Sequence, residues 1–210
     1  MDENRITVSG YASAEFTEKR STFIGYTDSV GTAEQAEAFV AGIKKKNSDA
    51  RHNVWAYLLD NGAMRYSDDG EPQGTGGLPV LEVIKKNHAV NTVIVVTRYF
   101  GGILLGAPGL VRAYSKAAAM AVEAAGLATY SLFSDCEIVC DYAEYDKLLY
   151  EIGRYDVIPG QTEYADSVTL RFSVRKEEAD LLRRQIATVT NARRAVTVVG
   201  ERYERSEKIK

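Results

Sequence analysis

Residues 91–117 read NTVIVVTRYFGGILLGAPGLVRAYSKA, and this stretch decides the fold of the first half of the chain. Residues 91–100 are almost continuously apolar, which predicts a strand buried on both faces. A glycine-rich loop follows, and residues 110–125 form an alanine-rich segment that predicts a helix ending at Gly126. A buried strand that leads through a glycine loop into a helix is typical of a mixed α/β (α+β) domain.

The rest of the first half is expected to alternate strands with helices. Thr32 and Gln35 form a potential capping box before an apolar stripe at helical spacing. The sequence DNG at residues 60–62 is a strong turn signal between two strands. We expect strands at residues 6–16, 21–30, 52–59 and 63–67, and helices at residues 32–47 and 78–87.

The second half predicts a different arrangement. Its apolar segments follow the order strand, helix, strand, strand, helix, strand, which is the ferredoxin-like βαββαβ pattern. The boundary is expected between residues 127 and 134. We therefore predict an N-terminal domain at 1–130, a C-terminal domain at 135–203 and a frayed tail at 204–210.

Cys136 and Cys140 fall in the first strand of the second domain. Four steps along a strand separate them by ~13 Å, beyond the reach of a disulfide. We expect both to be reduced and to pack on the same face.

The overall charge gives no support for one class of function. The chain has 26 basic and 29 acidic residues, so its net charge is −3, and the charges are spread over both halves. A global positive field for nonspecific nucleic-acid binding is therefore absent, although local patches of positive charge remain possible.

No stretch reaches the ~18 continuous apolar residues of a membrane span, and the start MDENR lacks the pattern of a secretory signal. We expect a soluble, cytoplasmic protein without a membrane partner.

The loop at residues 101–109 carries the stronger signal for an anion site. Gly101 and Gly102 allow backbone amides to point at one place, and a helix start favours an anion there. Arg112 is predicted in the first helical turn, where a cation opposes the helix dipole by ~0.3–1 kcal/mol. Lys116 follows one turn later, and Arg98 precedes the loop, so three cations are expected to converge. The alternative is that the glycines only permit turns while Arg112 pairs with a carboxylate such as Asp69.

The acidic loop SDDGEPQGTGG, residues 67–77, allows three interpretations. Its carboxylates, Asp68, Asp69 and Glu71, could hold a hard cation, act as acid and base, or form salt bridges while the glycines shape a turn. His52, at a strand start, is either a structural hydrogen-bonded residue or a general base. Neither glycine loop matches a Walker or dinucleotide-binding pattern, and we expect no cofactor.

Four segments together resemble the IMPACT/YigZ family, in its bacterial two-domain YigZ form. They are KRSTFIGY (19–26), ARHNVWAY (50–57), YSDDGEPQGTGGLP (66–79) and VVTRYFGGILLGAPGLVRAYSKA (95–117), with RYFGGILLG the most specific. The resemblance implies an N-terminal domain similar to ribosomal protein S5 domain 2. It also implies a C-terminal ferredoxin-like domain similar to late domains of elongation factor G.

The same resemblance bears on function. Eukaryotic IMPACT members regulate translation by binding the activator of a starvation-responsive kinase, a pathway that bacteria lack, and YigZ members are similar to nucleic-acid or ribosome binders. This chain departs from the family pattern at Leu104, where a lysine is frequent, and at residues 107–109, where Pro108 removes a backbone donor.

Three functional hypotheses follow. The first is an RNA- or ribosome-binding protein that modulates translation. The second is a metal-dependent enzyme for a phosphorylated small molecule, disfavoured because no activated nucleophile is apparent. The third is a protein-interaction module, and the oligomeric state stays open. The expected nucleic-acid or anion site contains Lys19, Arg20, Arg51, His52, Arg98, Gly101, Gly102, Arg112 and Lys116. The second-domain arginines Arg183, Arg184, Arg193 and Arg194 could extend this surface.

Overall fold

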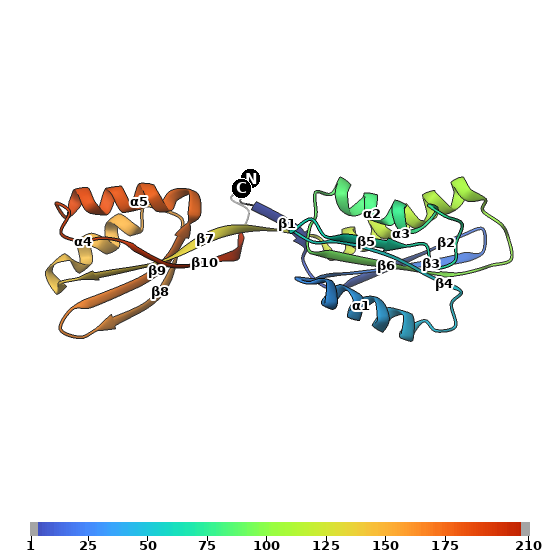
Figure 1. Ribbon diagram of the computed structural model, residues 1–210, viewed down its shortest axis with the longest axis horizontal. Helices are drawn as coiled ribbons and strands as arrows, with labels where there is room; N and C mark the ends of the chain where they lie inside the picture. Colours follow the sequence, from blue (N-terminus) through green and yellow to red (C-terminus); the bar gives the residue numbers. More distant parts are fainter. Residues whose placement is uncertain (1–3, 207–210) are drawn as a thin grey trace. The chain divides into compact units, whose positions relative to one another are not determined.

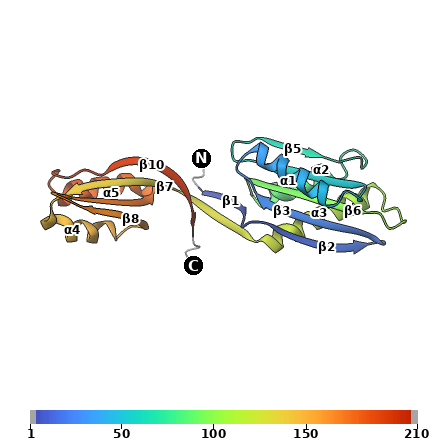
Figure 2. The same cartoon turned by 90° about the horizontal axis from the view of Figure 1, so that it is seen from below.

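A computed structural model gives the fold of residues 4–206 (Figures 1 and 2). Residues 1–3 and 207–210, which belong to the predicted N-terminal domain and the predicted tail, lie outside the described residues. The chain divides into two compact units. We call Arg5–Thr129 the N-terminal unit and the segment from Tyr130 onward, together with Asn4, the C-terminal unit.

The N-terminal unit is built on a five-stranded sheet in the order β2-β3-β6-β4-β5. The strands are β2 (Ala12–Glu18), β3 (Ser21–Ser29), β6 (Thr92–Tyr99), β4 (His52–Leu58) and β5 (Met64–Ser67). All four pairings are antiparallel, so the α+β part of the predicted fold class describes this unit. The helices α2 (Gly77–Lys86) and α3 (Ala107–Ala125) cover one face, and α1 (Ala33–Lys46) covers the other (Figure 1).

The central strand β6 is buried on both faces, as its continuous apolar sequence predicted. Ile94 and Val96 belong to the core beneath α2 and α3, whereas Val93 and Val95 belong to the core beneath α1. Successive side chains of a strand point to opposite faces, so only a strand between two helical layers can bury both sets. The prediction from this stretch is therefore confirmed.

The predicted strand at residues 6–16 is two strands. β1 (Asn4–Val8) and β2 are separated by Gly10, whose φ of 151° favours glycine. β1 belongs to the other sheet, where it pairs with β7 (Leu127–Cys140). The expected boundary at residues 127–134 contains the division between the two units, at Thr129 and Tyr130, and β7 runs through it without interruption.

The C-terminal unit has the predicted βαββαβ order. After β7 come α4 (Tyr142–Ile152), β8 (Val157–Tyr164), β9 (Val168–Arg175), α5 (Lys176–Val189) and β10 (Thr197–Ser206). The sheet order is β1-β7-β9-β8, with β10 also paired to β7; residues 5–8 of β1 are counted in the N-terminal unit. Cys136 and Cys140 are free and buried in the same core, as expected.

The tail prediction was wrong for residues 204–206. These residues continue β10, and Ser206 Oγ accepts a hydrogen bond from Arg175 Nη2 at 3.0 Å.

Gly25 allows α3 to approach the sheet closely. A Cβ atom at this position would lie 2.3 Å from the carbonyl oxygen of Ala117 and 3.1 Å from Cβ of Ala121. Any larger residue must therefore push α3 away from β3. Because α3 also lines the candidate site described below, this contact places that helix over the sheet.

We predict that Gly25→Ala destabilises the protein. Forcing a methyl group against backbone atoms in a packed core costs about 1–3 kcal/mol, which urea denaturation of the purified protein would measure. Gly42→Ala is the matched control, because Gly42 lies in α1 and a Cβ there meets nothing within 4 Å. Alanine favours a helix over glycine, so the control should be neutral or stabilised by up to ~1 kcal/mol. Equal destabilisation of both variants would contradict the close-approach argument.

Candidate functional site: a cationic pocket between the β2–β3 turn and helix α3

The predicted site residues gather at one end of the five-stranded sheet. The register pairs Thr22 at the start of β3 with Tyr99 at the end of β6, and His52 at the start of β4 with Arg98. The β2–β3 turn, the loop after β6 and the acidic loop after β5 therefore share this end. The fold brings these segments together, but it gives their charged side chains two different roles.

The turn between β2 and β3 consists of Lys19 and Arg20, because Glu18 pairs directly with Ser21. Both turn residues have positive φ, 45° and 64°, which is the pattern of a type I′ hairpin turn. Such turns prefer Asn-Gly, because the Cβ atom of most other residues lies too close to a carbonyl oxygen in the left-handed region, at a cost of ~1–2 kcal/mol. Two cationic residues thus occupy positions whose backbone angles are unfavourable for them.

Gly101 packs against this turn. A Cβ atom on Gly101 would lie 1.9 Å from the carbonyl oxygen of Arg20, and the Gly101 N–H donates to Ser21 Oγ at 3.2 Å. Gly102, with a φ of 86°, then allows the loop to turn. The two glycines are therefore explained by backbone packing and turning.

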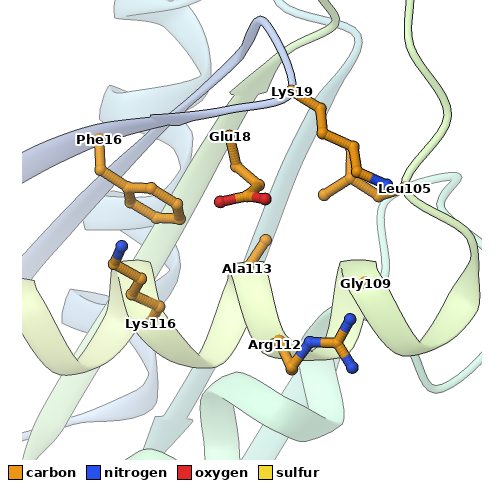
Figure 3. Close-up of a pocket in the computed structure, with 8 residues that line it drawn as sticks. All are labelled: Phe16, Glu18, Lys19, Leu105, Gly109, Arg112, Ala113 and Lys116. Atoms are coloured by element: carbon orange, nitrogen blue, oxygen red, sulfur yellow. The ribbon is translucent and has the colours of Figure 1, made fainter.

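A pocket of about 240 Å³ lies between the turn and α3 (Figure 3). Three cationic side chains line it, those of Lys19, Arg112 and Lys116, and all three residues are exposed. Within residues 4–206 neither Lys19 nor Arg112 makes an ion pair. Lys116 Nζ lies 4.3 Å from the centre of the Phe16 ring, a cation–π contact. Arg112 does not pair with Asp69, so the pocket presents positive charge to solvent.

The pocket also contains residues that the sequence interpretation missed. They are Phe16, Glu18, Leu105 and Ala113, whereas Gly109 belongs to the glycine loop that the sequence singled out. Phe16 and Glu18 alternate along β2, and Gly109, Arg112, Ala113 and Lys116 follow helical spacing, so the individual faces were readable. The two faces come together only because α3 packs over β2, and no local sequence pattern predicts that packing.

The position of Arg112 in its helix was predicted wrongly. The helix α3 begins at Ala107, with Gly106 as N-cap, because Pro108 suits a helix start. Arg112 is thus beyond the first turn, where the dipole effect has largely fallen off. Its unpaired state, rather than a dipole penalty, makes it a candidate for binding an anion.

Arg98 does not join these cations. Its Nη1 atom lies 2.6 Å from Oε1 of Glu71, and the two side chains are only 7% and 4% exposed. The Tyr114 hydroxyl donates to the same carboxylate oxygen at 2.7 Å, and burial raises the Tyr114 pKa above its ordinary value, which keeps the proton in place. The predicted convergence of Arg98 with Arg112 and Lys116 is therefore wrong.

The acidic loop is held by its own carboxylates. Asp68 accepts hydrogen bonds from the backbone N–H groups of Gly74, Gly76 and Gly77 at 2.8–2.9 Å. Partial burial raises the Asp68 pKa, but these three donors outweigh it, so the pKa lies below its ordinary value. Asp69 contacts Lys44 Nζ at 2.5 Å and the Asn53 N–H at 2.7 Å.

The three carboxylates therefore point to three different sets of protein donors. Among residues 4–206 no three His, Cys, Asp or Glu side chains group as a metal site. The loop fits the salt-bridge and turn interpretation. His52 fits its structural interpretation, because its Nδ1 donates a hydrogen bond to the Asp69 carbonyl at 2.9 Å. Arg51 is exposed just before β4.

Of the four arginines suggested in the C-terminal unit, three are neutralised, whereas Arg184 makes no ion pair among the described residues. Arg183 pairs with Asp180 at 3.4 Å, Arg193 with Glu144 at 3.1 Å, and Arg194 with Asp141 at 2.5 Å and with Glu144 at 2.6 Å. The suggested extension of the cationic surface over these residues is therefore weak.

Comparison with known proteins identifies the family. The Impact N-terminal domain matches residues 19–122, and the Domain of unknown function (DUF1949) matches residues 138–193. IMPACT family member YvyE of Bacillus subtilis is 33% identical over 195 residues, covering 92% of this chain and 90% of that protein. The chain belongs to the IMPACT family.

Other members of the IMPACT family match over shorter spans. IMPACT family member YigZ of Escherichia coli is 32% identical over 157 residues, which are 73% of this chain and 76% of that protein. Protein IMPACT of Mus musculus is 34% identical over 97 residues, 43% of this chain and 30% of that protein. A crystal structure of a hypothetical protein has a TM-score of 0.63 at 25% identity, covering 95% of this chain and 99% of that chain. In the part of the chain that the structure describes, no helix is long and apolar enough to span a membrane.

We predict that Glu71→Gln strongly destabilises the protein. Removing one partner of a buried ion pair leaves the Arg98 charge uncompensated, at a cost of about 3–5 kcal/mol. Urea denaturation would measure this, with Glu82→Gln as control, since Glu82 forms an exposed pair with Lys85 that contributes little. Combining Glu71→Gln with Arg98→Met should recover part of the loss. A cost below ~1 kcal/mol for Glu71→Gln would show that the pair does not hold the site.

The Asp68 hydrogen bonds predict a pH dependence of stability. A lowered carboxyl pKa in the folded state contributes stability above the ordinary pKa of 3.8, and this contribution disappears as the pH falls through the folded value. The stability difference between the wild type and Asp68→Asn should therefore be constant near neutral pH and shrink from about pH 5 to about pH 3. Thermal unfolding across this range tests it. A difference that grows with acidity would contradict the assignment.

Proposed function

We propose that the chain binds RNA through the cationic pocket, and that it acts on translation by associating with RNA or the ribosome. The observation that carries the proposal is a pocket whose Lys19 and Arg112 have no ion pair within residues 4–206. Unpaired cations on one surface attract a phosphate backbone, and release of counterions drives such binding.

The strained turn supports the same proposal. Lys19 and Arg20 adopt backbone angles that Asn-Gly would adopt at lower cost. Conformational strain that stability alone would remove is typical of functional positions. Their retention is explained if positive charge is needed at this point.

The fold adds a weaker argument. β10 beside β7, then β9 and β8, is the strand order of a ferredoxin-like sheet, with α4 and α5 packed in one core. This supports the proposed similarity to late domains of elongation factor G. The similarity of the N-terminal unit to ribosomal protein S5 domain 2 is proposed from the family resemblance alone.

Replacing the turn by Lys19→Asn with Arg20→Gly tests the proposal without harming the fold. Asn-Gly suits a type I′ turn, so the variant should be at least as stable as the wild type. It should bind a labelled single-stranded RNA more weakly in fluorescence anisotropy. The slope of log K against log salt should fall by about 0.7 for each phosphate that the variant no longer neutralises.

Lys45→Gln is the control for this experiment. Lys45 is exposed on α1, on the opposite face of the sheet, and its replacement removes one positive charge. This control should keep the affinity and the salt slope of the wild type. A wild type that does not bind RNA at low salt, or a Lys45→Gln loss equal to that of the turn variant, would defeat the proposal.

A second candidate is a protein partner, favoured by the apolar tip of the loop after β6. Phe100, Ile103 and Leu104 are 43%, 40% and 81% exposed. Affinity capture that recovers one protein partner after nuclease treatment, and loses it with Leu104→Ser, would favour this candidate. Capture that depends on intact RNA would favour the first.

A further inference from the structure

We propose that Glu18 makes the cationic pocket select an unpaired guanine, by accepting hydrogen bonds from its base while the cations hold neighbouring phosphates. This inference rests on the proposed function, because it assumes that RNA is the ligand. It adds what the cations cannot supply, which is a preference for one base.

Glu18 is placed by the strand and the turn. It is the last residue of β2 and pairs with Ser21 across the hairpin. Phe16 and Glu18 are two residues apart, so their side chains share one face of the strand. Figure 3 shows the Glu18 carboxylate directed toward α3, above Ala113 and between Phe16 and Leu105. The carboxylate thus belongs to the pocket that contains the cations.

The charge of Glu18 is out of place in a site for phosphate alone. Like charges repel, so a carboxylate in the pocket weakens the binding of a bare phosphate. Glu18 also makes no ion pair with a described residue, although three cations line the same pocket. A ligand that presents N–H donors beside its negative charge satisfies both groups at once.

The walls of the pocket carry small and apolar groups next to those charges, with Phe23 stacked on the Phe16 ring and Lys116 Nζ over it. Phe16 and Leu105 are half-buried, and Ala113 and Gly109 offer little side chain on the helix. The volume of about 240 Å³ is below the ~300–1,000 Å³ of pockets that hold drug-sized ligands. It is therefore matched to a single base, with the phosphates outside near the exposed cations.

The chemistry of a carboxylate chooses among the bases. An ionised carboxylate only accepts hydrogen bonds. Guanine presents two adjacent donors, N1–H and N2–H, on its Watson–Crick edge, whereas uracil presents one donor flanked by two carbonyl acceptors. That edge is free only in unpaired RNA, which is also where proteins read RNA sequence. A single-stranded guanine is the ligand that this geometry favours.

The test uses three decamers of uridine that differ at one central position, occupied by guanosine, inosine or uridine. Inosine lacks only the 2-amino group of guanine, so it removes one of the two donors. The wild type should bind the guanosine decamer about tenfold more tightly than the other two, in the range of a good bidentate base contact. Fluorescence anisotropy at fixed salt gives the three affinities.

Glu18→Gln should reduce the guanosine preference to about twofold or less, because an amide offers one acceptor and one donor in place of two acceptors. Glu15→Gln is the matched control, since Glu15 is exposed on the other face of β2 and loses the same charge. This control should retain the preference of the wild type.

The outcomes separate the two proposals. Equal binding of all three decamers by the wild type, combined with loss of binding in the Lys19→Asn, Arg20→Gly variant, overturns the guanine inference and keeps RNA binding. A uniform gain of affinity for all decamers in Glu18→Gln also overturns it, because Glu18 would then only repel phosphate. Absence of binding to every decamer in the wild type overturns the proposed function itself.

Discussion

The buried contact between Arg98, Glu71 and Tyr114 is the interaction on which this end of the N-terminal unit depends. It joins the central strand β6, the acidic loop and helix α3 through one carboxylate. The Arg98 guanidinium also lies close to two aromatic rings, 5.5 Å from the centre of Phe23 and 5.3 Å from that of Phe100. A charge so far from water is tolerable only when it is paired, so the three segments are held in one relative position.

This constraint explains why neither glycine-rich loop supplies a cation to the pocket, although the loop after β6 contributes Leu105 to its wall. The acidic loop directs Asp68 to its own backbone and Glu71 inward. The loop after β6 directs Gly101 against the β2–β3 turn. The cations that make no ion pair among the described residues come from the turn and from the side of α3 that lines the pocket. The structure thus separates residues that fix the loops from residues that remain available to a ligand.

The same separation favours a binding protein over a metal-dependent enzyme among the functional hypotheses. A metal-dependent enzyme needed carboxylates that converge, and these carboxylates instead bind separate protein donors. A binding protein needs charge that faces solvent, and Lys19, Arg112 and Lys116 supply it. Membership of the IMPACT family is compatible with this, and the translation role stays a proposal that the RNA experiments test.

Local sequence patterns were sufficient for most of the fold. The apolar run of β6 predicted burial on both faces, and the Thr32 cap, the DNG turn and the βαββαβ order were all readable, because periodicity and turn chemistry are local properties. The start of α3 and the break at Gly10 were missed, since element boundaries depend on contacts as well as on propensity. Which cation is buried and which is free was decided only in three dimensions. Arg98 and Arg112 look alike in the sequence, yet a carboxylate 27 residues away in the chain reaches Arg98 and none reaches Arg112 among the described residues.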